Sequence, residues 1–354
     1  MKTFIGMLIV IVTVHSGWAQ EPYEIQKIAD GVYVFIAEDP TKDVVNGNSI
    51  LVIGDNGALV FDSGTSLREA KWLVSEIKKL TTKPVKFVVN SHWHWDHWIG
   101  NQVFTEAYPQ CQIIAHSSTR NAMMYQYPRF VKQALLTQGD MIATFKKELE
   151  TGNHEGGDPL TTYEKKRWAR TYSDLVKDSA ETRQYRETLP TMTFDKKLTL
   201  YMGAREIQLV FLGNANTRGD AAMILPAEKI LVTGDILVAP VPYAFGVSPR
   251  SWIGVLKNIA SMDVHLIVPG HGAVQTDKSY VQNVIALFES SYEQVAAGRR
   301  QGLNAKDAIT KVDIEKFRKI FAGDDEAKNW AFTNYYVKPM LDRMYKELGG
   351  ELGE

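Results

Sequence analysis

The stretch NSHWHWDHWIG, residues 90–100, places three histidines and one aspartate within six positions. It follows the apolar run VKFVVN at 85–90, which predicts a buried strand. The cluster therefore lies on the loop that leaves a strand end, where layered α/β folds bind ligands. The whole chain has only eight histidines, so a chance gathering of three of them is the less favoured alternative.

His92, His94, Asp96 and His97 have the chemistry of metal ligands. Histidines two positions apart on an extended loop can converge on one ion, while Asp96 and His97 can face a neighbouring ion. Imidazole and carboxylate together suit zinc, with iron or manganese as alternatives. A bound metal lowers the pKa of its water to roughly 7, which makes hydroxide available at neutral pH. The stretch therefore predicts a metal-dependent hydrolase.

The sequence around the cluster predicts two β-then-α halves. Short apolar runs bounded by turn residues predict strands at 31–37, 48–54, 57–64, 85–90 and 111–116. Residues 66–80 form an amphipathic helix in which Ser66 and Glu69 have the spacing of a capping box. A second helix is predicted at 249–262, before a strand that ends in VPGHG.

The amino-acid composition of the chain changes between residues 117 and 188. Charged, helix-forming residues dominate there, split near 151–159, and predict a helical hairpin inserted between strands. The last third of the chain is also helical. We therefore expect one domain over 20–276 that contains the 117–188 insertion, followed by a helical extension over 277–354.

Residues 1–19 have the pattern of a secretory signal peptide. Lys2 precedes an apolar run at 4–14, and a small-x-small pattern ends at Ala19. The run is too short to span a bilayer comfortably. We expect an exported protein, located in the periplasm and without a stable membrane anchor.

The composition of the chain limits the classes of binding partner that we expect. The formal net charge of −1 lacks the strongly basic footprint of a nucleic-acid-binding protein. Cys111 is the single cysteine of the chain, so no internal disulfide is expected. A small-molecule substrate is the expected partner, and the oligomeric state stays open.

The histidine cluster resembles the HxHxDH signature of the metallo-β-lactamase superfamily. Further landmarks occur in the family's order between about residues 30 and 275. Asp62 in FDSG resembles the early aspartate that supports the metal loop, Asp235 in ILVTGD the aspartate shared by two metals, and His271 in VPGHG the last ligand. The resemblance implies an αββα sandwich, which is two β-sheets face to face with helices outside.

The resemblance also implies two metal positions. The first takes His92 and His94, the second takes Asp96, His97 and His271, and Asp235 is shared. The implied cofactor is one or two zinc ions, with Asp96 and Asp235 as the catalytic residues. His116 ends a strand at a place where the family often has a histidine near the site, and we interpret it as a packing or supporting residue.

The chain departs from the family's GHTxGD string. NANTRGD places Asn216 where the third histidine of the first position belongs. An amide oxygen is a weaker zinc ligand than imidazole nitrogen. Three possibilities stay open: Asn216 binds weakly and both ions are held, only the second position fills, or the protein binds a ligand without catalysis. We favour the first two, because all the other ligands are present.

The substrate is the least determined feature. Trp93 and Trp95 alternate with the ligands, and Tyr243 follows the shared aspartate, so we expect them to line the substrate pocket. We expect zinc-bound hydroxide to attack a carbonyl ester, lactone or lactam. Hydrolysis of sulfate or phosphate esters, and a non-catalytic metal- or ligand-binding role, are the alternatives.

Overall fold

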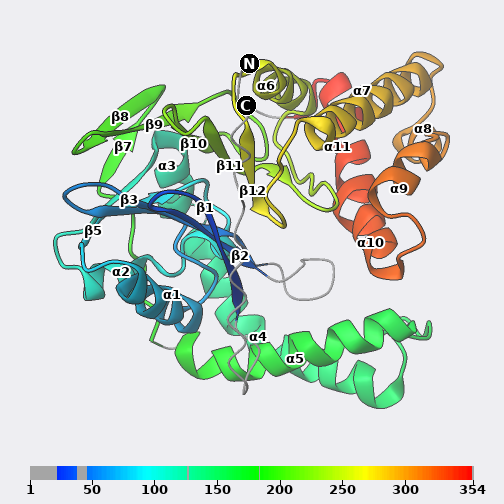
Figure 1. Cartoon of the computed structure of the whole chain (residues 1–354). Coiled ribbons are helices and arrows are strands. Elements are labelled where there is room, and N and C mark those ends of the chain that lie inside the picture. The colour runs from blue at the N-terminus through cyan, green and yellow to red at the C-terminus, as the bar shows by residue number, and fades with distance from the viewer. Residues whose placement is uncertain (1–21, 38–45, 126, 183, 353–354) are drawn as a thin grey trace.

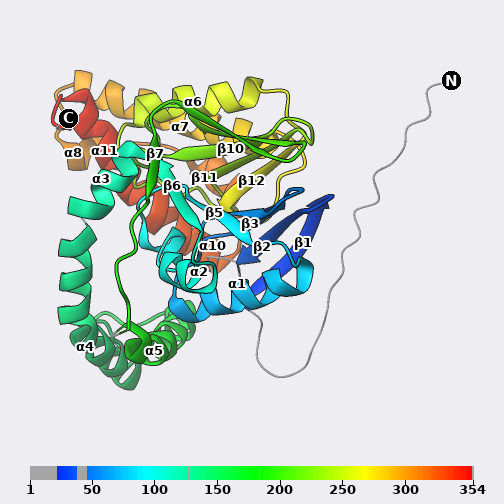
Figure 2. The same cartoon turned by 90° about the vertical axis from the view of Figure 1, so that its left-hand side faces the viewer.

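The computed structural model describes residues 22–37, 46–125, 127–182 and 184–352 (Figure 1). The predicted signal peptide at 1–19 lies outside these residues. Two β-sheets face each other, and helices cover both outer faces (Figure 2). Within the described residues, none of the helices is both long and apolar enough to cross a membrane.

The first sheet has seven strands in sequential order, antiparallel from β1 to β4 and parallel from β4 to β7. They are β1 (Tyr23–Ala29), β2 (Val32–Ala37), β3 (Ser49–Ile53), β4 (Ala58–Phe61), β5 (Val85–Asn90), β6 (Gln112–His116) and β7 (Met192–Phe194). The second sheet has the order β12-β11-β10-β9-β8, in which only β11 and β12 are parallel. Its strands are β8 (Lys197–Met202), β9 (Arg205–Phe211), β10 (Ala221–Leu225), β11 (Ile230–Val238) and β12 (Leu266–His271).

Apolar side chains from both sheets form the central core, among them Val34, Phe61, Leu209 and Val232. Helices α1 (Leu67–Leu80) and α2 (Asn101–Ala107) cover the first sheet, and α6 (Pro249–Ser261) and α7 (Ser279–Arg300) cover the second (Figure 2). The predicted cap of α1 is present, since the Ser66 hydroxyl accepts a hydrogen bond from the Glu69 N–H at 3.2 Å. The expected αββα sandwich is confirmed.

The 117–188 segment contains α3 (Ser117–Tyr125), α4 (Tyr127–Thr151) and α5 (Thr162–Thr182), and α4 and α5 lie side by side, away from the sheets (Figure 2). The chain after β12 continues through α7 into α8 (Ala305–Thr310), α9 (Glu315–Phe321), α10 (Glu326–Ala331), the π-helical turn η2 (Phe332–Val337) and α11 (Lys338–Leu348).

The two helical segments touch each other. Arg167 of α5 donates a hydrogen bond to the Tyr335 hydroxyl at 2.6 Å and lies 4.8 Å from the centre of the Trp330 ring. Residues of the predicted insertion and of the predicted extension therefore meet although 168 positions separate Arg167 from Tyr335.

Strand direction gathers the candidate site at one edge of the sandwich. Parallel β4 and β5 end at Phe61 and Asn90, so Asp62 and the histidine cluster leave the first sheet together. The 3-10 turn η1 (Trp95–His97) follows β5. In the second sheet, Asp235 lies within β11 and His271 ends the parallel strand β12.

Candidate metal centre

Two histidines and two carboxylates converge to form the larger candidate metal position. The His97 Nε2 atom lies 3.3 Å from Asp96 Oδ2 and 3.3 Å from Asp235 Oδ1. The His271 Nε2 atom lies 3.2 Å from the same two oxygens. Asp96, His97 and His271 each have a ligand atom within 4.8 Å of the others, and all three are buried.

A second group shares Asp235. The His92 Nε2 atom lies 3.5 Å from Asp235 Oδ2, and His92, His97 and Asp235 form a buried set within 4.8 Å. His94 belongs to neither of these sets. Its Nδ1 atom instead lies 3.4 Å from Nδ2 of Asn216, so the structure places Asn216 beside His94.

Hydrogen bonds on the outer side of the rings fix how the histidines face. The His97 Nδ1–H donates to Asp62 Oδ2 at 2.8 Å, and the His271 Nδ1–H donates to the Asn46 carbonyl at 2.7 Å. The His92 Nδ1 atom shares a hydrogen bond with the Ser91 hydroxyl at 2.9 Å. Such outer contacts hold the Nε2 atom of each ring toward the interior of the site.

Asp62 performs this role from an uncommon backbone conformation. Its φ angle is 64°, a region that aspartate tolerates better than most residues. Besides His97, its carboxylate accepts a hydrogen bond from the Ser91 N–H at 2.7 Å. Asp62 therefore ties the beginning and the end of the histidine loop to the first sheet.

The inward atoms fit a metal ion. Nε2 of His92, His97 and His271, and Oδ1 of Asp235, are buried and have no hydrogen-bond partner among the described residues. A buried polar atom without a partner is costly, and native proteins seldom keep several of them together. Imidazole nitrogen with carboxylate oxygen is a donor set that zinc accepts, and iron and manganese use the same atoms.

Electrostatics point the same way. Burial by itself lowers the pKa of both His97 and His271. The nearby carboxylates of Asp96 and Asp235 outweigh this effect. The pKa of His97 is therefore raised well above its usual value, and that of His271 is raised to about 9. Burial, and next the neighbouring His97, lower the pKa of His92 well below its usual value. Two buried carboxylates therefore demand positive charge, which a divalent cation supplies in exchange for protons.

Asn216 lies at the shared carboxylate. Its Nδ2 atom is 3.4 Å from Asp235 Oδ2, and the residue is 2% exposed. Its Oδ1 atom is buried and accepts no hydrogen bond from the part of the chain that the structure describes. The amide thus lies beside both His94 and Asp235.

Close packing brings the backbone of β12 against the Asp235 side chain of the neighbouring strand β11. A Cβ atom on Gly270 would overlap Oδ1 of Asp235, so only glycine fits next to this ligand. The carbonyl of Gly270 accepts a hydrogen bond from the Asn48 N–H at 2.7 Å. Sequence reasoning did not identify Asn46, Asn48 or Gly270, because backbone acceptors and close approaches leave no motif.

The remaining predicted residues lie farther from the ligand atoms. Trp93 and Trp95 are half-buried and pack against Trp98 and Met123, although the Trp93 ring also contacts His94 at 4.8 Å between ring centres. The ring of Tyr243 is buried beside His271, at 5.9 Å between centres.

His116 faces neither candidate metal position. Its Nε2–H donates to the Asp195 carbonyl at 2.9 Å, its Nδ1 accepts from the Ser118 N–H at 3.2 Å, and its ring stacks on Phe211. These contacts are those of a packing residue that caps the start of α3.

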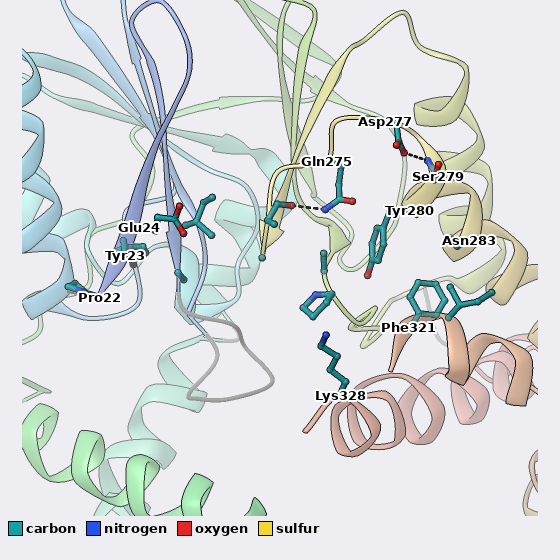
Figure 3. A pocket seen from close by; sticks show the side chains of 17 residues that line it. Pro22, Tyr23, Glu24, Gln275, Asp277, Ser279, Tyr280, Asn283, Phe321 and Lys328 are labelled. Carbon is teal, nitrogen blue, oxygen red and sulfur yellow. Dashed lines mark hydrogen bonds between the residues drawn. The ribbon is translucent and has the colours of Figure 1, made fainter. Parts of the chain in front are cut away.

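A cavity of about 880 Å³ opens between the edge of the first sheet and the C-terminal helices (Figure 3). Its walls include Ile36, Pro240, Gly272, Tyr280 and Phe321. Trp93, Trp95 and Tyr243, the predicted pocket residues, do not line it. Sequence reasoning did not identify this cavity, since its walls come from segments that are distant in sequence.

Comparison with known proteins gives a family and a fold. Residues 43–271, more than half of the chain, match the sequence profile of the Metallo-beta-lactamase superfamily. A linear primary-alkylsulfatase of Pseudomonas sp. is 19% identical over 276 residues, which cover 75% of this chain and 49% of the relative. The chain therefore spans about half the length of that curated relative.

Three solved structures illustrate the fold. A metallo-beta-lactamase from Pontibacter korlensis has a TM-score of 0.50 and 18% identity, covering 75% of this chain and 99% of its own. An inverting sec-alkylsulfatase from Pseudomonas sp. has a TM-score of 0.61 and 14% identity, and the match covers 92% of this chain and 50% of the sulfatase chain. A metallo-beta-lactamase family protein from Thermus thermophilus has a TM-score of 0.57 and 15% identity, and the match covers 92% of this chain and 95% of the Thermus chain.

The profile match, the two-sheet architecture and the order of the motifs agree. The identities of the solved neighbours are low, so these likenesses establish the fold alone. The chain belongs to the metallo-β-lactamase superfamily, whose members are mostly metal-dependent hydrolases.

Proposed function

We propose that the protein is a metal-dependent hydrolase of esters, with Asp96, His97, Asp235 and His271 holding one ion and His92 with His94 offering a second position. The observation that carries this proposal is the set of inward Nε2 atoms around Asp235 Oδ1, which lack hydrogen-bond partners among the described residues. A metal held there would lower the pKa of its bound water and would polarise the scissile bond. Zinc is the first candidate ion for this donor set, with iron or manganese as alternatives.

The protein's own residues prepare the site. Asp62 and the Asn46 carbonyl hold His97 and His271 in the tautomer that leaves Nε2 free. Asp235 contacts ligand atoms of both groups, and its negative charge favours cations at either position. The amide oxygen of Asn216 is a weaker metal ligand than an imidazole nitrogen, so it weakens the His94 side and favours occupancy of the Asp96 side.

An alkyl sulfate ester is the first candidate substrate. The curated relative is an alkylsulfatase, and a sec-alkylsulfatase shares the fold over 92% of this chain, including most of the helices outside the sandwich. The neighbour from Thermus thermophilus has the same coverage, but its name states no substrate. The likeness supports a sulfate ester without identifying the alcohol.

A carbonyl substrate is the second candidate. The β-lactamase from Pontibacter korlensis matches this fold over 99% of its own length, so its whole fold is contained here. An ester, lactone or lactam is also what the sequence led us to expect. Export to the periplasm and a small-molecule substrate complete the proposal and rest on the sequence alone.

The test compares substrates with and without metal. Purified protein is assayed with decyl sulfate, p-nitrophenyl butyrate and a chromogenic cephalosporin, after chelation and after zinc is restored. We expect zinc-dependent hydrolysis of at least one, with decyl sulfate the best. His271→Ala should lose this activity, whereas His265→Ala, which removes an exposed histidine six positions away, should keep it. Equal activity of the two variants would contradict the proposal.

A further inference from the structure

The cavity of Figure 3 has no role in the metal chemistry described above. We propose that it binds the apolar chain of the ester substrate, an inference that rests on the proposed function. Its volume of about 880 Å³ falls within the roughly 300–1,000 Å³ of ligand pockets. One wall is the edge formed by β1 and β2, and the other is the turn after β12 with α7 and α9–α10 (Figure 3).

The cavity is built against the strand end that carries a metal ligand. Gly272 lines the cavity and directly follows His271. Ala239 also lines it, and its N–H donates to the His271 carbonyl at 3.1 Å. Gly272 has a φ of 79°, and a Cβ atom there would overlap the Ala239 carbonyl. The cavity and the metal centre are therefore separated along the chain by one tight corner.

Asn48 joins both walls of the cavity to that corner. Its Oδ1 accepts a hydrogen bond from the Ala37 N–H at 3.0 Å, and its Nδ2 donates to the Gly272 carbonyl at 2.8 Å. Ala37 and Gly272 both line the cavity, and Asn48 is fully buried. The cavity is thus preformed, and its walls are fixed relative to His271.

Apolar and polar side chains both line the cavity, and the apolar ones supply the contacts for a hydrocarbon chain. Ile36, Pro240 and Phe321 contribute aliphatic and aromatic atoms. The Tyr280 hydroxyl donates to the Val238 carbonyl at 2.6 Å, so the ring of Tyr280 rather than its hydroxyl is available to a ligand. Such walls favour a hydrocarbon chain.

The charges of the lining disfavour an anionic group. Glu24 and Asp277 carry two negative charges against the single ammonium of Lys328. A sulfate or carboxylate head gains no net attraction there, whereas a metal ion held by Asp96, His97, Asp235 and His271 would offer it a cation. The head group therefore lies at the metals and the chain in the cavity, which points to esters of medium- or long-chain alcohols.

The proposal predicts a chain-length dependence. Each methylene buried contributes about 0.8 kcal/mol, which corresponds to about a fourfold gain in kcat/KM. We expect kcat/KM to rise along a series of alkyl sulfates or alkyl esters from butyl to decyl, and to level off once the cavity is filled.

Asn283→Phe tests the location. Asn283 lines the cavity from α7 (Figure 3), and the larger ring of phenylalanine at this position would narrow it. Gln282→Phe is the matched control, because Gln282 is the exposed neighbour in the same helix. The ratio of decyl to butyl kcat/KM should fall at least tenfold in Asn283→Phe and stay unchanged in Gln282→Phe. A wild-type ratio near one, or an unchanged ratio in Asn283→Phe, would overturn the proposal.

Direct binding separates this inference from the proposed function. Calorimetric titration with decanol should show binding to the wild type and Gln282→Phe, and at least tenfold weaker binding to Asn283→Phe. Decanol binding with this pattern but no ester hydrolysis would leave the cavity assignment standing and remove the hydrolase. Ester hydrolysis with equal decanol affinity in all three proteins would do the reverse.

Discussion

At position 216 the chain has an amide, and the Asn216 Nδ2 atom lies 3.4 Å from both His94 Nδ1 and Asp235 Oδ2. The two candidate metal positions are therefore unequal. The one at Asp96 has two histidines and two carboxylates. The other has His92 and the shared carboxylate, with His94 and the Asn216 amide as the further ligands that the sequence leads us to expect. We expect the wild type to retain fewer than two tightly bound zinc ions.

Asn216→His should strengthen the weaker position. Imidazole is the better zinc ligand, so a second zinc ion should bind at least tenfold more tightly. Zinc titration with elemental analysis after dialysis against a mild chelator measures this. Identical stoichiometry in the two proteins would mean that residue 216 does not face a metal. Two tightly held ions in the wild type would mean that a further ligand exists.

His116 provides a pH-dependent test that is independent of the metal. Burial lowers its pKa below the usual value, so the folded state binds the proton less readily than the unfolded state. Its contribution to stability is therefore complete above the unfolded pKa of 6.5 and declines as the pH falls below that value.

His116→Gln should weaken this decline. The loss of unfolding free energy between pH 7 and pH 5 should be smaller in the variant, by less than about 1 kcal/mol. Urea unfolding of both proteins at the two pH values measures the difference. An equal loss in both proteins would show that His116 does not titrate between them.

At the scale of single residues, the sequence predicted the site residues whose side chains have distinctive chemistry. The histidine cluster, Asp62, Asp235 and His271 lie in recognisable strings, and the structure brings them to one edge of the sandwich. Asn46 could not be found this way, because it acts through its carbonyl, 225 positions from His271. Trp93 and Trp95 were expected to line the substrate pocket, because they alternate with the ligands. They pack instead against Trp98 and Met123, and the alternation alone does not reveal this contact.

The α4–α5 hairpin contacts the C-terminal helices through side chains around Arg167. Arg167 is 6% exposed and donates hydrogen bonds to the hydroxyls of Tyr163 and Tyr335. Its guanidinium also lies over the Trp330 ring. Trp330 in turn donates to Glu164 at 3.3 Å, so the described residues of α5 contact the C-terminal helices through this cluster.

Arg167→Met should release this contact. Methionine keeps much of the packing volume but loses the hydrogen bonds and the cation–π contact, which together contribute about 2 kcal/mol. Hydrogen exchange over 162–170 and 326–337 should accelerate at least tenfold, since local opening becomes easier. Lys166→Met, at an exposed neighbouring position, is the control. Unchanged exchange in Arg167→Met would show that the hairpin is held elsewhere.

Element positions followed from the sequence where periodicity and caps were strong. Helix α1 begins and ends as predicted, and β5 matches the predicted strand. The docking of α5 on the C-terminal helices was not predicted, because Arg167 and Trp330 resemble ordinary residues of amphipathic helices. Contacts between two helices distant in sequence leave no periodic signal in either one.

At the scale of the whole molecule, the two sheets bring metal ligands from four segments to one edge. The first sheet supplies the histidine loop together with Asp62, and the second supplies Asp235, His271 and the segment of Asn216. Helices outside the sandwich add the cavity and the hairpin. A bound ion therefore links both sheets, and it should stabilise the fold in proportion to its affinity and concentration.

The central claim is that these convergent histidines and carboxylates form a metal centre on which hydrolysis depends. The most direct measurement is the number of metal ions per chain, determined with the rate of ester hydrolysis in the same sample, for the wild type and His271→Ala. We predict at least one ion per wild-type chain, its loss in His271→Ala, and a rate that follows the metal content as zinc is removed and restored. A metal-free wild type that hydrolyses its ester at the full rate would contradict the account.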